Sequence, residues 1–151
     1  MRRALLPVST VALLLAGCGG SGHLSGDQLR SRATALCATA GRQTERIPTP
    51  AAPAGGRAFL KRGIDALTPE LRALRQLKPP DDLAQVYATG VGAFTQKLSA
   101  LKAAVRDLDS GTNPVTAMTA LQQRLAPIEQ AEDGAWQALE VPACMNHPAA
   151  S

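Results

Sequence analysis

The apolar spacing between residues 83 and 108 constrains the fold more than any other feature of this sequence. From Tyr87 onward, large apolar residues recur at alternating steps of four and three, which keeps them on one face of a helix. The residues in this register are Leu83, Tyr87, Val91, Phe94, Leu98, Leu101, Val105 and Leu108. Asp81 or Asp82 is the expected N-cap of this helix. Such a face needs other helices to cover it, so the pattern predicts a helical bundle.

Two amphipathic stretches precede this helix. The first is expected to begin at the N-cap Asp27 and to end near Ile47, because the Pro-Thr-Pro sequence that follows cannot continue a helix. Residues 48–56 then form a linker. The second stretch carries leucine or isoleucine on one face from residue 60 to residue 77. Pro69 interrupts it, and Thr68 is able to cap a new helix there, but the unbroken register favours one kinked element.

A fourth helix is expected from Pro114 to Leu139, with Val115 on its inward face and a kink at Pro127. The Glu-Val-Pro sequence at 140–142 then ends the helix ahead of Cys144. Four amphipathic helices joined by short connections pack most simply as an antiparallel up-down-up-down bundle. The predicted fold class is therefore all-α, a four-helix bundle with kinked second and fourth helices.

The N-terminus has the form of an export signal. Two arginines precede a mostly apolar run from Ala4 to Ala16. Thirteen helical residues span about 20 Å, less than the ~30 Å of a bilayer core, so a secretory signal fits better than a transmembrane helix.

The end of this run, Leu15-Ala16-Gly17-Cys18, resembles a bacterial lipobox. The resemblance implies cleavage between Gly17 and Cys18, and attachment of membrane lipid to the Cys18 thiol. The alternative is an ordinary signal that leaves Cys18 as a free thiol or disulfide partner. The expected organisation is a signal peptide at 1–17, a lipidated cysteine with a Gly/Ser tether at 18–25, the bundle at 26–147 and a tail at 148–151.

Two cysteines remain after Cys18. In an exported chain, Cys37 and Cys144 are expected to form one structural disulfide. A redox pair or a metal site is the competing interpretation, although a Cys-x-x-Cys spacing is absent. The run Cys144-Met145-Asn146-His147 offers soft ligands for copper, but only if Cys144 is reduced. We expect no metal and no cofactor.

The arrangement as a whole resembles the small helical lipoproteins of high-GC Gram-positive bacteria, which are mostly of unassigned function. The matching residues are Cys18, Cys37, the segment Leu74 to Pro80, and the segment Val141 to Cys144. The resemblance implies a location on the extracytoplasmic face of the cell membrane and a helical architecture. It implies no activity.

Charge is distributed unevenly along the chain. Without residues 1–17 the net charge is only +2, and aromatic residues are few, which disfavours nucleic-acid binding. Residues 27–78 carry a net charge of +6, and residues 79–151 a net charge of −4. A basic face for anionic lipids or cell-wall polymers is one interpretation. Attraction between the two helix pairs, with most charges solvated, is the favoured one.

Residues able to support catalysis are scarce, and Glu132 is the main candidate. It lies near the apolar seam of the fourth helix, where burial would raise the pKa of its carboxyl and suit it to acid–base chemistry. More often such a residue reaches the edge of the bundle and meets an arginine. No nucleophile motif or ordered histidine partner is evident.

Two functional hypotheses follow, with an enzyme as a third. The first is a non-catalytic interaction or accessory module of the cell envelope, held by its lipid and bound to an envelope protein. The second is a carrier for a small apolar ligand, admitted where prolines and glycines let the helices separate. The residues expected to line that carrier's pocket are Tyr87, Gly90, Phe94, Met118 and Trp136.

Overall fold

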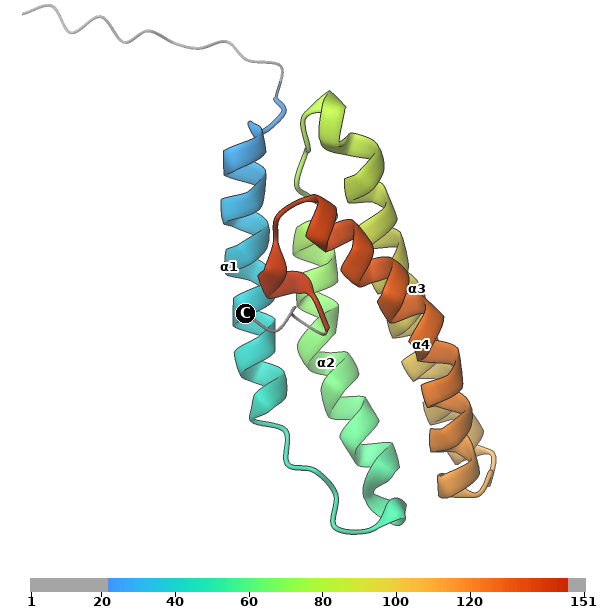
Figure 1. Cartoon of the computed structure of the whole chain (residues 1–151). Coiled ribbons are helices and arrows are strands. Elements are labelled where there is room, and N and C mark those ends of the chain that lie inside the picture. The colour runs from blue at the N-terminus through green and yellow to red at the C-terminus, as the bar shows by residue number, and fades with distance from the viewer. Residues whose placement is uncertain (1–21, 147–151) are drawn as a thin grey trace, which may run out of the picture.

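A computed structural model describes residues 22–146 and confirms the all-α bundle (Figure 1). Within this range the chain forms four α-helices and two short 3-10 helices and has no strand. The elements are α1 (Gly26–Glu45), η1 (Pro53–Gly55), α2 (Gly56–Leu74), α3 (Asp81–Asp109), α4 (Pro114–Ala138) and η2 (Pro142–Cys144). The predicted signal peptide, the Gly17–Cys18 cleavage site, lipidated Cys18 and residues 147–151 lie outside the described residues.

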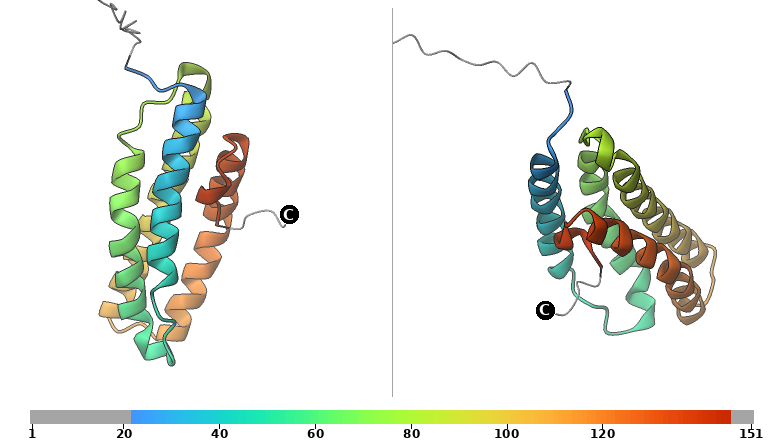
Figure 2. Two further views of the ribbon diagram at one scale, coloured as in Figure 1. Left: turned by 90° about the vertical axis from the view of Figure 1, so that its left-hand side faces the viewer. Right: turned by 45° about the horizontal axis from the view of Figure 1, so that its top comes forward.

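Successive helices run in opposite directions, as predicted (Figure 1). The tightest packing joins α3 to α4, followed by α2 to α3 and α1 to α2. The fourth side of the bundle is built differently. Here η2, which follows α4 in the chain, packs against both α1 and α4 and provides most of the connection between them. Figure 2 shows this segment lying between α1 and α4.

The helix ends differ from the prediction at two places. Ser25, not Asp27, caps α1 through a capping box, in which Gln28 N donates to Ser25 Oγ at 3.2 Å and Ser25 N donates to Gln28 Oε1 at 3.0 Å. The Ser-x-x-Gln spacing satisfies two backbone donors at once, which a cap at Asp27 would not. Pro80 occupies the N-cap of α3. Asp81 and Asp82 therefore lie in the first turn, where their negative charges interact favourably with the positive end of the helix dipole, and neither caps the helix.

Both internal prolines lie within single helices. Thr68 does not cap a new helix, because its hydroxyl donates to Ile64 O at 2.6 Å and α2 continues through Pro69. The helix ends at Leu74, earlier than the apolar register suggested. Similarly, α4 continues through Pro127, and it ends at Ala138 with Leu139 as its C-cap.

The chain reverses directly after α4. Glu140 adopts a left-handed backbone with φ 59°, and Val141 N donates to Trp136 O at 2.9 Å, which together form a Schellman-type C-cap. Arg30 of α1 supports this turn, since its Nε donates to Leu139 O at 3.1 Å and lies 3.0 Å from Glu140 Oε2. The reversal carries η2 back toward α1, as the breaker at 140–142 had suggested.

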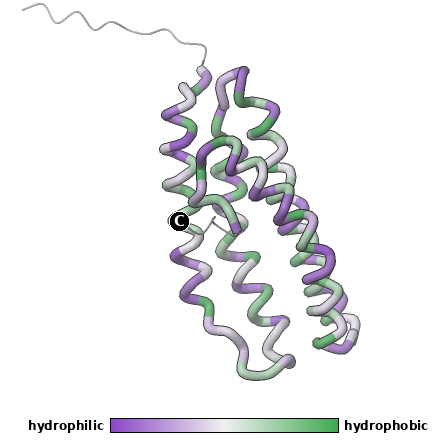
Figure 3. Tube along the Cα trace, viewed as in Figure 1, coloured by the Kyte–Doolittle hydropathy of each residue, from purple (hydrophilic) through white to green (hydrophobic). Residues whose placement is uncertain are grey.

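The apolar residues form two core clusters along the bundle. Hydrophilic and hydrophobic residues alternate along each helix in Figure 3, as expected for amphipathic helices. One cluster surrounds the fully buried Trp136 and extends from the middle of the bundle toward the end where α1 begins. The other surrounds Leu60 and Leu121 at the opposite end of the bundle. Val115 is an exception: it was expected to point inward, but it is 59% exposed because it borders an open groove between the start of α4 and the α1–α2 linker.

The N-terminal segment is fixed to one end of the bundle. Leu24 N donates to Lys78 O at 2.8 Å, and His23 Nδ1 lies 2.9 Å from Pro79 O. Residues 23 and 24, expected to be part of a flexible tether, are therefore bound to the α2–α3 connection. We call this end of the molecule the entry end, and the end formed by residues 42–62 and 106–124 the far end.

Candidate functional site

The two cysteines predicted to pair lie together. Cys37 of α1 and Cys144 of η2 form a disulfide, with their Cα atoms 5.0 Å apart. In this state Cys144 offers no thiolate for copper, and His147 lies outside the described residues. The disulfide fixes residues 143–146, the strap, against the middle of the bundle.

The five residues expected to line an apolar pocket do not share one cavity. Tyr87 and Gly90 pack against the Trp136 indole in the core instead. The Tyr87 and Trp136 rings meet edge to face at 5.8 Å, and a Cβ at Gly90 would lie 3.1 Å from the indole. Phe94 joins Trp136 beside a different, central cavity, whereas Met118 lies in a groove at the far end.

Tyr87 is held by a specific hydrogen bond. Its hydroxyl donates to Leu74 O at 2.6 Å, which satisfies a carbonyl at the end of α2. Burial raises the pKa of this phenol. The residue is therefore a structural link between α2 and α3.

The central cavity lies beside the disulfide and has a volume of about 230 Å³. Side chains of all four helices and of the strap line it. Its polar and aromatic lining residues are Thr44, Glu70, Phe94, Lys97, Glu132, Trp136 and Asn146. The cavity is thus a mixed polar site, not the apolar pocket expected from the sequence.

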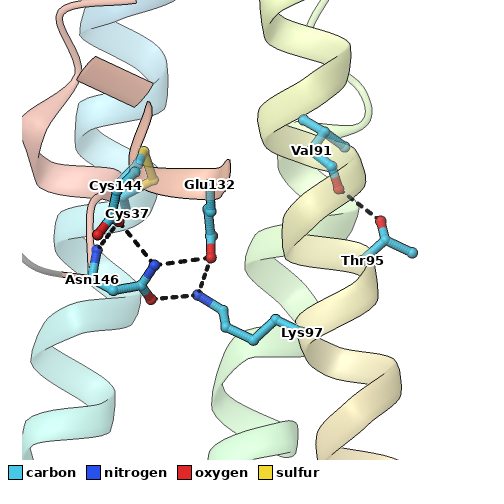
Figure 4. Close-up of polar contacts among 8 residues, drawn as sticks. Cys37, Val91, Thr95, Lys97, Glu132, Cys144 and Asn146 are labelled. Carbon is cyan, nitrogen blue, oxygen red and sulfur yellow. Dashed lines mark hydrogen bonds and ion pairs between the residues drawn. A yellow bond between two sulfur atoms is a disulfide. The ribbon is translucent and has the colours of Figure 1, made fainter. Parts of the chain in front are cut away.

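A buried charge network forms one wall of this cavity (Figure 4). Lys97 Nζ lies 2.7 Å from Glu132 Oε2 and donates to Asn146 Oδ1, also at 2.7 Å. Asn146 Nδ2 donates to Glu132 Oε2 at 3.0 Å, which closes a triangle of three side chains. The Lys97 ammonium also lies 4.7 Å from the centre of the Phe94 ring. Each charged group of the triangle thus has its counter-charge and a further polar partner.

Glu132 is buried, as one of the two sequence-based interpretations expected. It is only 2% exposed, so it does not reach the edge of the bundle, and its partner is Lys97 of α3, not an arginine. The pairing explains how a charged residue is kept in the core, since a buried carboxylate without a counter-charge costs several kcal/mol.

Asn146 was not identified from the sequence, although it organises the network. Its backbone N donates to Asp133 Oδ1 at 2.6 Å, in addition to its three side-chain contacts, with Lys97, Glu132 and Asp133. These contacts fasten the end of the strap to α3 and α4. No sequence signal marks the residue, because its position depends on the path of the chain after the disulfide.

Glu70 is the second residue that sequence analysis missed. It lines the cavity from α2 and, within residues 22–146, has no ion pair or hydrogen bond to another side chain. Burial raises its pKa to about 8, with a further increase from the charge of Glu132 and a partial decrease from that of Lys97. Near pH 7 this carboxyl is mostly protonated.

A second concavity, the apolar groove, lies at the far end. It measures about 410 Å³ and is formed by the α1–α2 linker, the start of α2 and the first two turns of α4. Its apolar lining residues are Pro50, Ala51, Ala52, Pro53, Phe59, Pro114, Val115 and Met118. Val115, the exposed residue noted above, is part of this surface.

An exposed ion pair lies near the groove. Arg57 Nε donates to Asp109 Oδ1, which joins the start of α2 to the end of α3. The contact raises the pKa of the Arg57 guanidinium and lowers that of the Asp109 carboxyl. Its contribution to stability is small because both groups are open to solvent.

Among residues 22–146, no helix has the length and apolarity needed to cross a bilayer, and no group of three His, Cys, Asp or Glu side chains is arranged to hold a metal ion. No family model, curated protein or solved structure matches the chain.

Proposed function

We propose that this protein is a lipid-anchored, non-catalytic interaction module on the extracytoplasmic face of the cell membrane. The anchor in this proposal is Cys18 of the Leu-Ala-Gly-Cys sequence, with residues 1–17 removed. The observation that carries the proposal is the position of the apolar groove at the opposite end of the bundle from the point where the chain enters.

The distances support this orientation. Residues 18–21 span at most about 14 Å when extended, so a lipid on Cys18 would hold the entry end close to the membrane. The 20 residues of α1 separate that end from the far end by about 30 Å. The groove would therefore face away from the lipid surface, and the tether cannot reach to cover it.

The chemistry of the far end indicates the kind of partner. Residues 42–62 and 106–124 contain seven Lys or Arg and three Asp or Glu, a net charge of +4. An apolar groove with a basic surround fits an apolar segment flanked by acidic residues. We propose such a segment of another envelope protein as the occupant.

The carrier hypothesis receives less support. The five residues predicted to line the carrier's pocket are divided between the packed core, the central cavity and the far-end groove. The central cavity, which lies inside the bundle, is lined by charged side chains. An apolar ligand placed beside Lys97 and Glu132 would leave these groups without water and gain little in return.

Site-specific photo-crosslinking in intact cells tests the proposal. A photoreactive residue replaces Gln122, which lines the groove, or its neighbour Gln123, which does not. We expect a discrete protein adduct from position 122 only, lost when Val115→Asp places a charge in the groove and when Cys18→Ser releases the protein from washed membranes. Equal adducts from both positions, or an adduct that Val115→Asp does not alter, would contradict the proposed surface.

A further inference from the structure

The central cavity is lined by more acidic than basic groups. Its lining includes two carboxyl groups, Glu70 and Glu132, and one ammonium group, Lys97. Lys97 is committed to Glu132 at 2.7 Å, and Asn146 completes that network. The lining residues of α1 and the strap bring no titratable group, because both cysteines are in the disulfide. Glu70 therefore faces the cavity with no counter-charge of its own.

A second polar group beside the cavity also lacks a partner. Trp136 lines the cavity and is fully buried, and its indole Nε1 has no hydrogen-bond partner in the described part of the chain. Buried polar groups in proteins are nearly always satisfied by protein, water or ligand. Because an indole N–H only donates and an ammonium group cannot accept, the acceptor here would be a water molecule or a hydroxyl group carried by the ligand. The cavity is large enough for a ligand, since about 230 Å³ corresponds to roughly seven water volumes.

We infer that the central cavity binds a small organic ammonium ion, with the Glu70 carboxylate as its counter-charge. With one such cation bound, the carboxylates of Glu70 and Glu132 are balanced by two ammonium groups, that of Lys97 and that of the ligand. A metal ion is a poorer fit, because residues 22–146 offer no group of three acidic, histidine or cysteine side chains to coordinate it. An anion would meet the excess of carboxylates.

Binding of this cation is coupled to loss of a proton. In the empty cavity burial raises the pKa of Glu70 to about 8, so the carboxyl is mostly neutral at pH 7. The ligand requires the carboxylate, so each binding event near pH 7 releases close to one proton. Apparent affinity should rise nearly tenfold per pH unit below about pH 8 and level off above it. Lys97 and Glu132 are the other charged groups facing the ligand, and their mutual pairing is retained.

Calorimetry on the full chain, purified in detergent with its disulfide intact, tests the inference. The probes are methylammonium and ethanolammonium, titrated in buffers of different ionisation enthalpy so that proton release is measured directly. We expect one site, proton release near pH 7, and the stated pH dependence in the unmodified protein. These measurements need no variant.

Glu70→Gln and Asp65→Asn form the matched pair of variants. Both lie on α2 and lose one carboxylate, but Asp65 is exposed and outside the cavity. We expect Glu70→Gln to weaken binding at least tenfold above about pH 8 and to abolish the pH dependence, and Asp65→Asn to change neither. Absence of binding by both probes up to about 10 mM in folded protein, or unchanged binding by Glu70→Gln, would overturn the inference. Neither result bears on the far-end groove, which the cross-linking tests separately.

Discussion

Replacing Gly90 by alanine should destabilise the bundle, whereas the same change at Gly92 should stabilise it. Both glycines lie within α3, where alanine is favoured over glycine by about 1 kcal/mol. Their surroundings differ. A Cβ at Gly92 meets nothing within 4 Å, whereas a Cβ at Gly90 would lie 3.1 Å from Cε2 and 3.2 Å from Cζ2 of Trp136.

The indole is constrained on the side that packs against Tyr87. Trp136 is 0% exposed and meets the Tyr87 ring edge to face at 5.8 Å, and Tyr87 is itself fixed by its hydrogen bond to Leu74 O. Forcing an extra methyl group into a packed core costs about 1–3 kcal/mol. Because the helix-propensity gain is common to both variants, their difference isolates this packing cost. We expect Gly90→Ala to be less stable than Gly92→Ala by about 1–3 kcal/mol.

Urea unfolding measures both free energies. Circular dichroism reports loss of helix, and the fluorescence of Trp136, the single tryptophan of the chain, reports on the site itself. Coincident transitions by the two probes justify a two-state treatment. If the two variants agree within about 0.5 kcal/mol, the close contact between α3 and the indole does not constrain the core, and the reasoning fails.

Three further predictions concern the network, Glu70 and the disulfide. Lys97→Met leaves Glu132 buried without its counter-charge and should lower the free energy of unfolding by about 3–5 kcal/mol in urea titrations; a loss below about 1 kcal/mol would show that the pair is hydrated in solution. Because the pKa of Glu70 is raised from 4.5 to about 8, the native state holds a proton that the unfolded state has lost, so stability should fall as pH rises through this interval by at most about 1.4 kcal/mol per pH unit. Glu70→Gln should flatten that profile, and an unchanged slope would place its origin elsewhere. Cys37→Ser with Cys144→Ser opens a loop with a sequence separation of 107 and should cost about 4–5 kcal/mol in the chain-entropy estimate, checked by urea unfolding; stability equal to that of the unmodified protein would mean that the strap needs no covalent fixation.

Much of the architecture could be predicted because its causes are local. The four-and-three apolar spacing identified α3, and prolines with their neighbours marked the limits of the other helices to within a few residues. The cysteine pair followed from counting the thiols that remain after Cys18 in a chain with a predicted export signal. The errors at Asp27 and at Asp81 are shifts of one or two residues between the expected and the observed N-cap.

The central cavity was not predictable in the same way. Glu132 attracted attention as a carboxylate near an apolar seam, but nothing in the sequence marks Lys97 as its partner, and Asn146 was considered only within the Cys144–His147 run of possible copper ligands. Glu70 lies directly after Pro69, where sequence analysis looked for a kink and not for a titratable site. The predicted apolar pocket failed to form as one site for a related reason: Met118 and Trp136 share a helix but lie near different ends of it.

The sequence by itself determined the helical class, the number of helices and the two cysteines available for pairing, since periodicity and chain breakers act over a few residues. Only the tertiary structure decided which charged side chains meet, that Glu70 is left without a counter-charge, and that the apolar groove lies opposite the entry end. These features depend on how each helix is rotated about its axis and on where the strap returns. Rotation and return are fixed by contacts between residues far apart in the chain, such as Gly90 with Trp136 and Cys37 with Cys144, and no local pattern encodes them.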